Sequence, residues 1–212
     1  MTSYPLSLAL QNFMPVIISA AALWNLVRML ARDGAFAARA AGIATVLIVA
    51  GGAAKALWKL AMAAWSVDAP LLSGALFPLL APGFGLLALA VLRMPARIRV
   101  LGVAVISVVL AVAVAVAGGG GAWKMPLLTL LTAAMLACGA GLVLRARGQG
   151  DRIAAACVAF YVVASFALSG LAAAGAGTLA LQWTEQIIST IGAAALLWAA
   201  VRMRTTVMEA IQ

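Results

Sequence analysis

Long hydrophobic runs alternate along this chain with short polar connections, and this pattern dominates the sequence. A membrane core about 30 Å thick needs roughly 20 apolar residues for each helix that crosses it. The runs reach that length, and glycine, proline and arginine mark the connections between them. The pattern predicts an all-α integral membrane protein with seven transmembrane helices, at residues 5–29, 37–65, 70–93, 98–117, 122–144, 152–175 and 179–202.

The eleven arginines all fall on one side of this arrangement. They flank the first, third and fifth connections and follow the last helix, at Arg28, Arg32, Arg39, Arg93, Arg97, Arg99, Arg145, Arg147, Arg152, Arg202 and Arg204. Basic residues near helix ends favour the cytoplasmic side. The three lysines, Lys55, Lys59 and Lys124, fall toward the other side. We therefore expect a multi-pass protein of a bacterial-type cytoplasmic (inner) membrane, with the N-terminus outside and the C-terminus inside.

Short motifs recur in the two halves of the chain and indicate an internal repeat. The first and fifth predicted helices carry "NFMPVI" and "WKMPLL", and the third and seventh end in "ALAVLRM" and "LWAAVRM". We interpret these as two parallel three-helix repeats, 5–94 and 120–204, joined by a linker helix at 98–117 within a single seven-helix domain. The alternative is chance recurrence among similar hydrophobic helices.

This layout resembles that of the sugar-transporting SWEET family, which combines parallel triplets with an N-terminus outside. The chain lacks the Ser-Pro signature in the first helix and the proline–tyrosine motif in the second, so the resemblance is architectural. Microbial rhodopsins share the helix count, orientation and approximate length, but they carry their retinal lysine in the last helix. Here residues 179–202 contain no lysine. We therefore assign neither family and do not expect retinal.

Two lysines one turn apart interrupt the second predicted helix. Counted from Trp65 at about 1.5 Å per residue, Lys59 lies roughly 9 Å and Lys55 roughly 15 Å below the outer boundary. For Lys59 two interpretations stay open: its side chain reaches the headgroups by snorkelling, or it faces the bundle as a residue of a ligand site or an ion pair. A charge as deep as Lys55 costs at least about 2.5–3.5 kcal/mol on insertion scales. We expect Lys55 to face a partner or a water-filled cavity inside the bundle.

The last predicted helix offers such a partner in a polar stripe at spacings of three, four and seven residues. The stripe consists of Gln182, Glu185, Gln186 and Ser189. Glu185 is the only acidic residue inside a predicted span and lies at about the depth of Lys59. Two interpretations remain open: an ion pair that fixes helix packing, or a ligand-binding or coupling site, since ionisable residues inside a membrane are functional candidates.

Other helices place polar groups and helix breakers at comparable depth. Gln11, Asn12 and Tyr161 are further candidates for ligand binding. Proline removes a backbone donor and kinks or breaks a helix, and irregular backbone in a membrane is either buried in protein or lines a cavity. The expected hinge or kink positions are Pro15, Pro78, Pro82, Gly83 and Pro126.

Composition narrows the classes of function. Hydrophobic residues make up 67% of the chain, and the net charge of +9 comes from arginines between hydrophobic runs rather than an exposed basic face, so we expect no nucleic-acid binding. Histidine is absent, and no zinc set, phosphate loop or catalytic constellation is recognisable. We predict no catalytic residues, no metal and no cofactor, and do not expect an enzyme.

The leading hypothesis is a small-solute transporter with a polar pocket in the outer half of the bundle. Two lysines against one glutamate favour an anionic or zwitterionic ligand, and protonation of Glu185 is a natural means of coupling. The alternatives are a receptor-like or sensory protein that acts through a partner, and a structural subunit of a membrane complex. We expect the chain to lie in a lipid bilayer. An oligomer or a partner subunit is expected if it is a receptor-like protein or a structural subunit.

Overall fold

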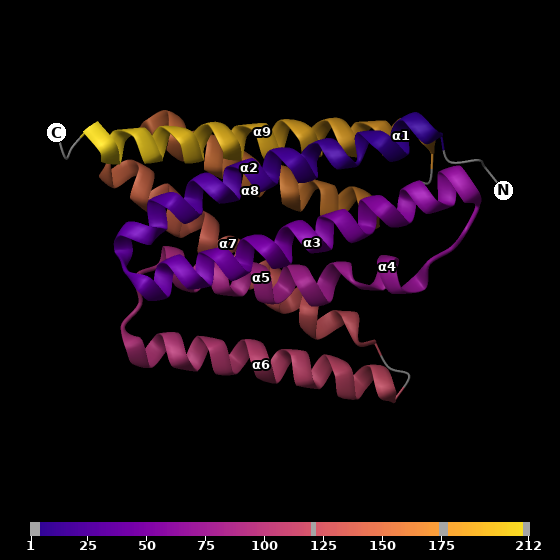
Figure 1. Cartoon of the computed structure of the whole chain (residues 1–212), viewed down its shortest axis with the longest axis horizontal. Helices are drawn as coiled ribbons and strands as arrows, with labels where there is room; N and C mark the ends of the chain where they lie inside the picture. The colour runs from indigo at the N-terminus through magenta and orange to yellow at the C-terminus, as the bar shows by residue number, and fades with distance from the viewer. Residues whose placement is uncertain (1–4, 120–121, 174–177, 210–212) are drawn as a thin grey trace.

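Helices account for all regular structure in the described part of the chain, residues 5–119, 122–173 and 178–209 of the computed structural model (Figure 1). In chain order the elements are α1 (Leu6–Gln11), α2 (Phe13–Leu30), the short 3-10 helix η1 (Ala31–Asp33), α3 (Ala35–Trp65), α4 (Pro70–Gly74), α5 (Leu76–Val91), α6 (Ala96–Gly118), α7 (Lys124–Gly148), α8 (Arg152–Ala173) and α9 (Leu179–Glu209).

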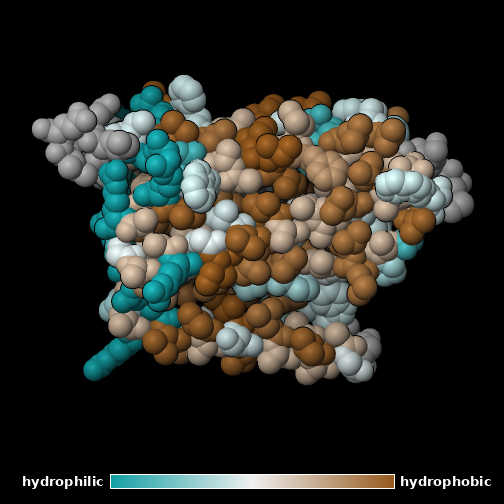
Figure 2. Space-filling model, in the orientation of Figure 1, coloured by the Kyte–Doolittle hydropathy of each residue, from teal (hydrophilic) through white to brown (hydrophobic). Residues whose placement is uncertain are grey.

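Six stretches of described helix are long and apolar enough to cross a membrane. They are Leu6–Asp33, Ala35–Trp65, Pro70–Val91, Ala96–Gly118, Lys124–Gly148 and Leu179–Thr206. Hydrophobic residues also cover the middle of the molecular face drawn in Figure 2. An all-helical, multi-pass membrane protein is thereby confirmed.

The predicted count of seven spans stays a prediction. The sixth predicted span, 152–175, corresponds to α8 and runs two residues beyond it, into positions 174 and 175, which lie outside the described part of the chain. Its described apolar stretch, Arg152–Leu168, is shorter than the other six. The predicted repeats and the orientation also stay predictions.

Six long helices pack side by side in a closed ring. Going round the ring, α2 contacts α3, α3 contacts α5, α5 contacts α7, α7 contacts α8, α8 contacts α9, and α9 returns to α2. Helix α6 lies outside this ring against α5 and α7, at the edge of the bundle in Figure 1. Most of its large side chains are exposed, as expected of a helix that faces lipid.

Prolines explain where the helices break. Pro15, Pro78 and Pro126 each occupy the third position of a helix, in α2, α5 and α7. Proline at that position cannot bond to the carbonyl four residues earlier, so the preceding turn separates from the helix. Asn12 accordingly divides α1 from α2, and Ala75 divides α4 from α5. Pro82 lies within α5 and is buried.

Small residues let helices approach closely in the bundle. Gly83 of α5 packs against α3, where an added Cβ would lie 2.8 Å from Cγ1 of Ile48. Contacts shorter than about 3 Å force neighbouring atoms to move, so glycine sets the separation of these helices. Gly83 therefore acts as a packing residue of the α3–α5 contact.

One end of the bundle, which we name the arginine end, carries the connections 31–34, 92–95 and 149–151 and the last turns of α9. Hydrophilic residues gather at this end, on the left of Figure 2. Asp33 accepts hydrogen bonds from Arg93 and, at 2.6 Å, from Arg145. Asp151 accepts one from Arg202 at 2.8 Å. These ion pairs join helices that are distant in sequence.

Candidate functional site

A central pocket of about 330 Å³ lies between the six ring helices, in the half of the bundle away from the arginine end. Each of the six contributes side chains to its wall, whereas α6 contributes none. Ligand pockets in proteins typically measure about 300–1,000 Å³, so this volume suits a small molecule. The pocket is therefore the candidate functional site.

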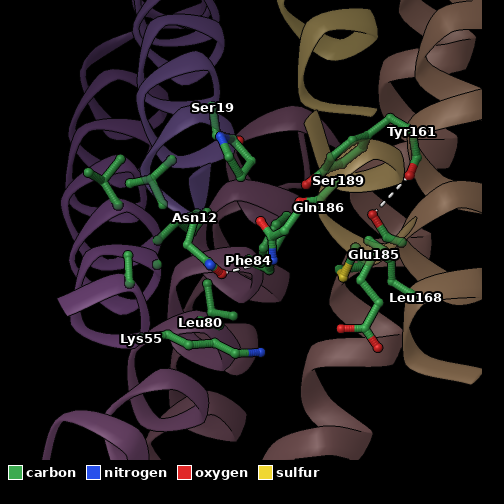
Figure 3. A pocket seen from close by; sticks show the side chains of 18 of the residues that line it. Asn12, Ser19, Lys55, Leu80, Phe84, Tyr161, Leu168, Glu185, Gln186 and Ser189 are labelled. Atoms are coloured by element: carbon green, nitrogen blue, oxygen red, sulfur yellow. Dashed lines mark hydrogen bonds between the residues drawn. The ribbon is translucent and has the colours of Figure 1, made fainter. Parts of the chain in front are cut away.

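In the part of the chain that the structure describes, three side chains that carry a formal charge line the pocket: Lys55 and Lys59 from α3, and Glu185 from α9. Figure 3 shows the ammonium group of Lys55 and the carboxylate of Glu185 pointing toward each other from opposite sides. Among the described residues, no ion pair or hydrogen bond joins Lys55 to Glu185. The sequence suggested Glu185 as the direct partner of Lys55; the structure instead places both around a shared space.

Lys55 is exposed although it lies deep in the bundle, because its side chain borders the pocket. A polar cavity of this size has room for water, which offsets part of the cost of a charge at this depth. The expectation that Lys55 faces the interior of the bundle agrees with its place in the pocket wall.

Amide side chains connect the break between α1 and α2 to α9. The amide nitrogen of Gln186 donates to Oδ1 of Asn12 at 2.8 Å, and Nδ2 of Asn12 donates to the carbonyl of Leu8 at 2.6 Å. Both amide side chains are buried, and both line the pocket. Next to them, Gln11 donates to Oγ1 of Thr190 at 3.5 Å. This network holds one wall of the site in place.

Hydroxyl groups from two other helices complete the polar lining. Tyr161 on α8 and Ser189 on α9 both face the pocket in Figure 3. Ser165, one turn beyond Tyr161, donates to the backbone carbonyl of Tyr161 at 2.8 Å and also lines the pocket. These groups add hydrogen-bonding capacity without adding charge.

The structure brings most of the sequence-predicted binding residues to the pocket and leaves two outside its wall. Gln182 is half-buried on α9 but does not line the pocket. Gln11 bonds to Thr190, behind the lining. Of the expected hinge positions only Pro15 lines the pocket. Pro78 follows the helix break at Ala75, Pro82 and Gly83 are buried within α5, and Pro126 lies in the first turn of α7.

Sequence reasoning missed the apolar part of the wall. Leu80 and Phe84 of α5, and Leu131 and Met135 of α7, line the pocket together with the polar groups. In a chain so rich in apolar residues, no local pattern distinguishes a pocket side chain from one in the core or facing lipid. Only the packing of the helices identifies these four.

On the side facing the arginine end, the pocket is closed by apolar packing. A second cavity of about 20 Å³ follows, lined mainly by apolar residues such as Leu23, Leu87 and Cys138. Leu26 and Leu142, which also line this cavity, belong to the main hydrophobic core, and the buried residues of that core continue the closure. The ion pairs of Asp33 and Asp151 then join the helix ends. The closed half thus contains an apolar layer and an ionic layer.

Comparison with known proteins shows no match to this chain among family models, curated proteins or solved structures. The chemistry of the site therefore has to be argued from its own residues. Within the described ranges, no three His, Cys, Asp or Glu side chains gather as a group that would hold a metal ion. The groups present are suited to binding a small molecule by charge and hydrogen bonds.

Proposed function

We propose that this chain is a small-solute transporter that receives its solute in the central pocket from the outer side of the membrane. In this proposal the chain spans the membrane seven times, with its arginine end in the cytoplasm. The asymmetric placement of arginine supports that orientation. The pocket then faces outward, and the apolar and ionic layers form the closed inner gate.

The position of the pocket between two matching halves carries this proposal. We name α2, α3 and α5 the first group, and α7, α8 and α9 the second group. Within each group the middle helix packs on both others, and the groups meet through two matching contacts, α2 with α9 and α5 with α7. The pocket is lined from both groups. A site between two repeats is the arrangement that alternating access uses.

The ion pairs of the arginine end occupy equivalent positions in the two groups. In the first group, Asp33 follows the first helix and binds Arg93 after the third helix. In the second group, Asp151 follows the first helix and binds Arg202 in the third helix. Equivalent charges at equivalent places support an internal repeat more strongly than short recurring motifs. They also give each group an ion pair of its own. Arg145 of the second group additionally joins Asp33 across the two groups, a contact that has to open when the groups move relative to each other.

Transport requires the pocket to open at the arginine end as well, and Cys138 is a native reporter of that opening. Cys138 is buried beside the small second cavity, on the closed side of the pocket. Cys157, the other thiol, is only partly buried and is replaced by alanine for the experiment. In proteoliposomes of known orientation, a membrane-impermeant thiol reagent applied at the arginine end is expected to label Cys138 during turnover.

The same proteoliposomes are assayed for uptake of labelled amino acids, carboxylates and sugars. A transporter takes up at least one of them, and excess of that solute on one side changes the labelling rate of Cys138. Binding without uptake, together with a Cys138 that stays unlabelled from the arginine end, would overturn the proposal and identify a receptor-like protein. Labelling of the Cys138→Ser, Cys157→Ala variant measures the background.

A further inference from the structure

The most informative feature of the pocket is a separated pair of opposite charges. Lys55 projects from α3 and Glu185 from α9, on opposite sides of the cavity (Figure 3). Within the described residues neither group has a hydrogen-bond or ion-pair partner, although both belong to the same cavity wall. The two charges are near enough to influence each other but are held apart by the fold.

This separation argues against a purely structural ion pair. Charges taken out of water are normally paired, because an unpaired charge in a protein interior is costly. A packing contact between α3 and α9 would gain most if the two groups touched. Instead, α2 lies between α3 and α9 on the shorter way round the ring, and the cavity fills the space that separates the two side chains. The arrangement leaves both charges available to a third group.

Charge complementarity limits what that group is. A simple anion at Lys55 would be attracted by Lys59 on the next turn of α3 but would bring a second negative charge near Glu185. A simple cation at Glu185 would face two ammonium groups. A molecule with a negative and a positive end places its negative end at the lysines and its positive end at the glutamate. Its repulsive pairs, negative end with glutamate and positive end with lysines, are then the most widely separated ones.

The rest of the lining suits the body of such a molecule. Phe84, Leu131 and Met135 provide an apolar surface, while Ser189 and the bonded amides of Asn12 and Gln186 provide hydrogen-bonding groups. A volume of about 330 Å³ is near the lower limit of ligand pockets, which favours a small metabolite over a nucleotide or an oligosaccharide.

We propose that the pocket binds a small zwitterion of the amino-carboxylate class, with its carboxylate at Lys55 and Lys59 and its ammonium group at Glu185. This proposal rests on the function proposed above for the site. It adds the chemical class of the substrate and the orientation of the bound substrate in the pocket. The carboxylate end points toward α3 and the ammonium end toward α9.

A series of ω-amino acids tests both the class and the distance between charges. The full chain is purified in lipid nanodiscs, and binding of glycine, β-alanine, 4-aminobutyrate and 6-aminohexanoate is measured by thermal shift and calorimetry. Propionate and propylamine are the single-charge controls for β-alanine, and butyrate and butylamine those for 4-aminobutyrate. At least one zwitterion is expected to bind ten times more tightly than either of its controls, with one chain length preferred.

Charge-removing variants assign the two ends of the ligand. Lys55→Met is expected to lower affinity for the preferred zwitterion at least tenfold, while binding of the matched amine is unchanged or improves. Glu185→Gln is expected to lower affinity for the same zwitterion, while binding of the matched carboxylate is unchanged or improves. Gln182→Leu, on α9 but outside the pocket wall, is the matched control and should leave affinity unchanged.

Three results would overturn the zwitterion proposal. They are binding of a carboxylate as tightly as its amino acid, no binding by any member of the series, and unchanged affinity in both charge-removing variants. Failure of the transport proposal looks different: a zwitterion binds with the expected charge dependence, but proteoliposomes take up none. Conversely, uptake of a sugar or a simple anion without zwitterion binding would retain transport and exclude this substrate class.

Discussion

Charged side chains are arranged differently in the two halves of this bundle. At the arginine end, Asp33 and Asp151 each contact an arginine directly. In the pocket half, Lys55 and Glu185 face each other without joining. Charges of the first kind hold helices together, whereas charges of the second kind remain available for a ligand. The contrast separates residues that stabilise the fold from residues that we propose for ligand binding.

Helix ends explain why the arginine end forms close contacts. Arg145 reaches Asp33 on η1 and also donates from Nε to the carbonyl of Val91 at 2.8 Å, at the last residue of α5. Carbonyl groups at a helix C-terminus lack partners within the helix and carry partial negative charge, so a guanidinium group suits them. One side chain therefore joins α7 to both α5 and the connection before α3.

The largest expected effect is the loss of Arg145. Arg145→Met leaves the mostly buried carboxylate of Asp33 with one arginine, and the Val91 carbonyl without its side-chain donor. Removing one partner of a buried ion pair typically costs 3–5 kcal/mol, and the remaining contact with Arg93 reduces that to about 3 kcal/mol. Unfolding in mild detergent, followed by circular dichroism, measures the change.

Arg147→Met is the matched control for this prediction. Arg147 lies two residues further along α7 and is exposed, so its loss removes the same charge with a cost below about 0.5 kcal/mol. Equal effects in the two variants would contradict the assignment of stability to the Asp33 contacts.

Much of the architecture follows from the sequence because its causes are local. Hydrophobic length predicts the membrane helices, and the helix breaks at Asn12 and Ala75 follow from Pro15 and Pro78. The lysine pair and the stripe around Glu185 also direct attention to the pocket, because charge within an apolar run is conspicuous.

What the sequence could not supply depends on contacts between distant segments. Asp33 and Asp151 stand near arginines in the sequence. Which arginines they contact depends on how the helix ends pack against one another. The distance between Lys55 and Glu185 depends on the closure of the ring. Hydrophobicity likewise gives no sign that Phe84 and Met135 border a cavity.

A smaller effect is expected at Asp151, which has two roles. Its carboxylate binds Arg202 at 2.8 Å and accepts the backbone N–H of Ala154 at 2.9 Å, which caps the start of α8. Asparagine keeps the cap but removes the charge, whereas alanine removes both. We expect Asp151→Asn to cost about 1 kcal/mol and Asp151→Ala about 2 kcal/mol in the free energy of unfolding at neutral pH.

The contribution of Asp151 also depends on pH. The hydrogen bond from Arg202, followed by that from the Ala154 N–H, holds the pKa of Asp151 below its usual range. The stabilisation is therefore complete above the unfolded-state pKa of about 3.9 and is lost as the pH falls through the lower folded-state pKa. The difference in stability between the native chain and Asp151→Asn should shrink below about pH 4. A constant difference from pH 6 to pH 3 would contradict the ionic role.

Gln186 belongs to both kinds of residue compared above, because it lines the pocket and also donates a hydrogen bond to Asn12. Gln186→Leu leaves Oδ1 of Asn12 without that donor and should cost about 1 kcal/mol, in the range of hydrogen bonds inside membrane proteins. Gln182→Leu is the matched control on the same helix, and its stability should change by less than about 0.5 kcal/mol. Equal costs would show that the Gln186–Asn12 bond does not hold α9 to α2.

The smallest effect on stability is expected for the charges in the pocket itself, and this prediction bears most directly on the comparison. Lys55→Met and Glu185→Gln break no ion pair, and each removes a charge from the membrane interior. In the absence of ligand, the free energy of unfolding of each variant should therefore fall by less than about 1 kcal/mol, or rise slightly. A loss above about 2 kcal/mol in both, matching Arg145→Met, would mean that the pocket charges hold the helices together. The difference between the two halves would then disappear, because a pair that stabilises the empty protein is already satisfied and has less to gain from a ligand.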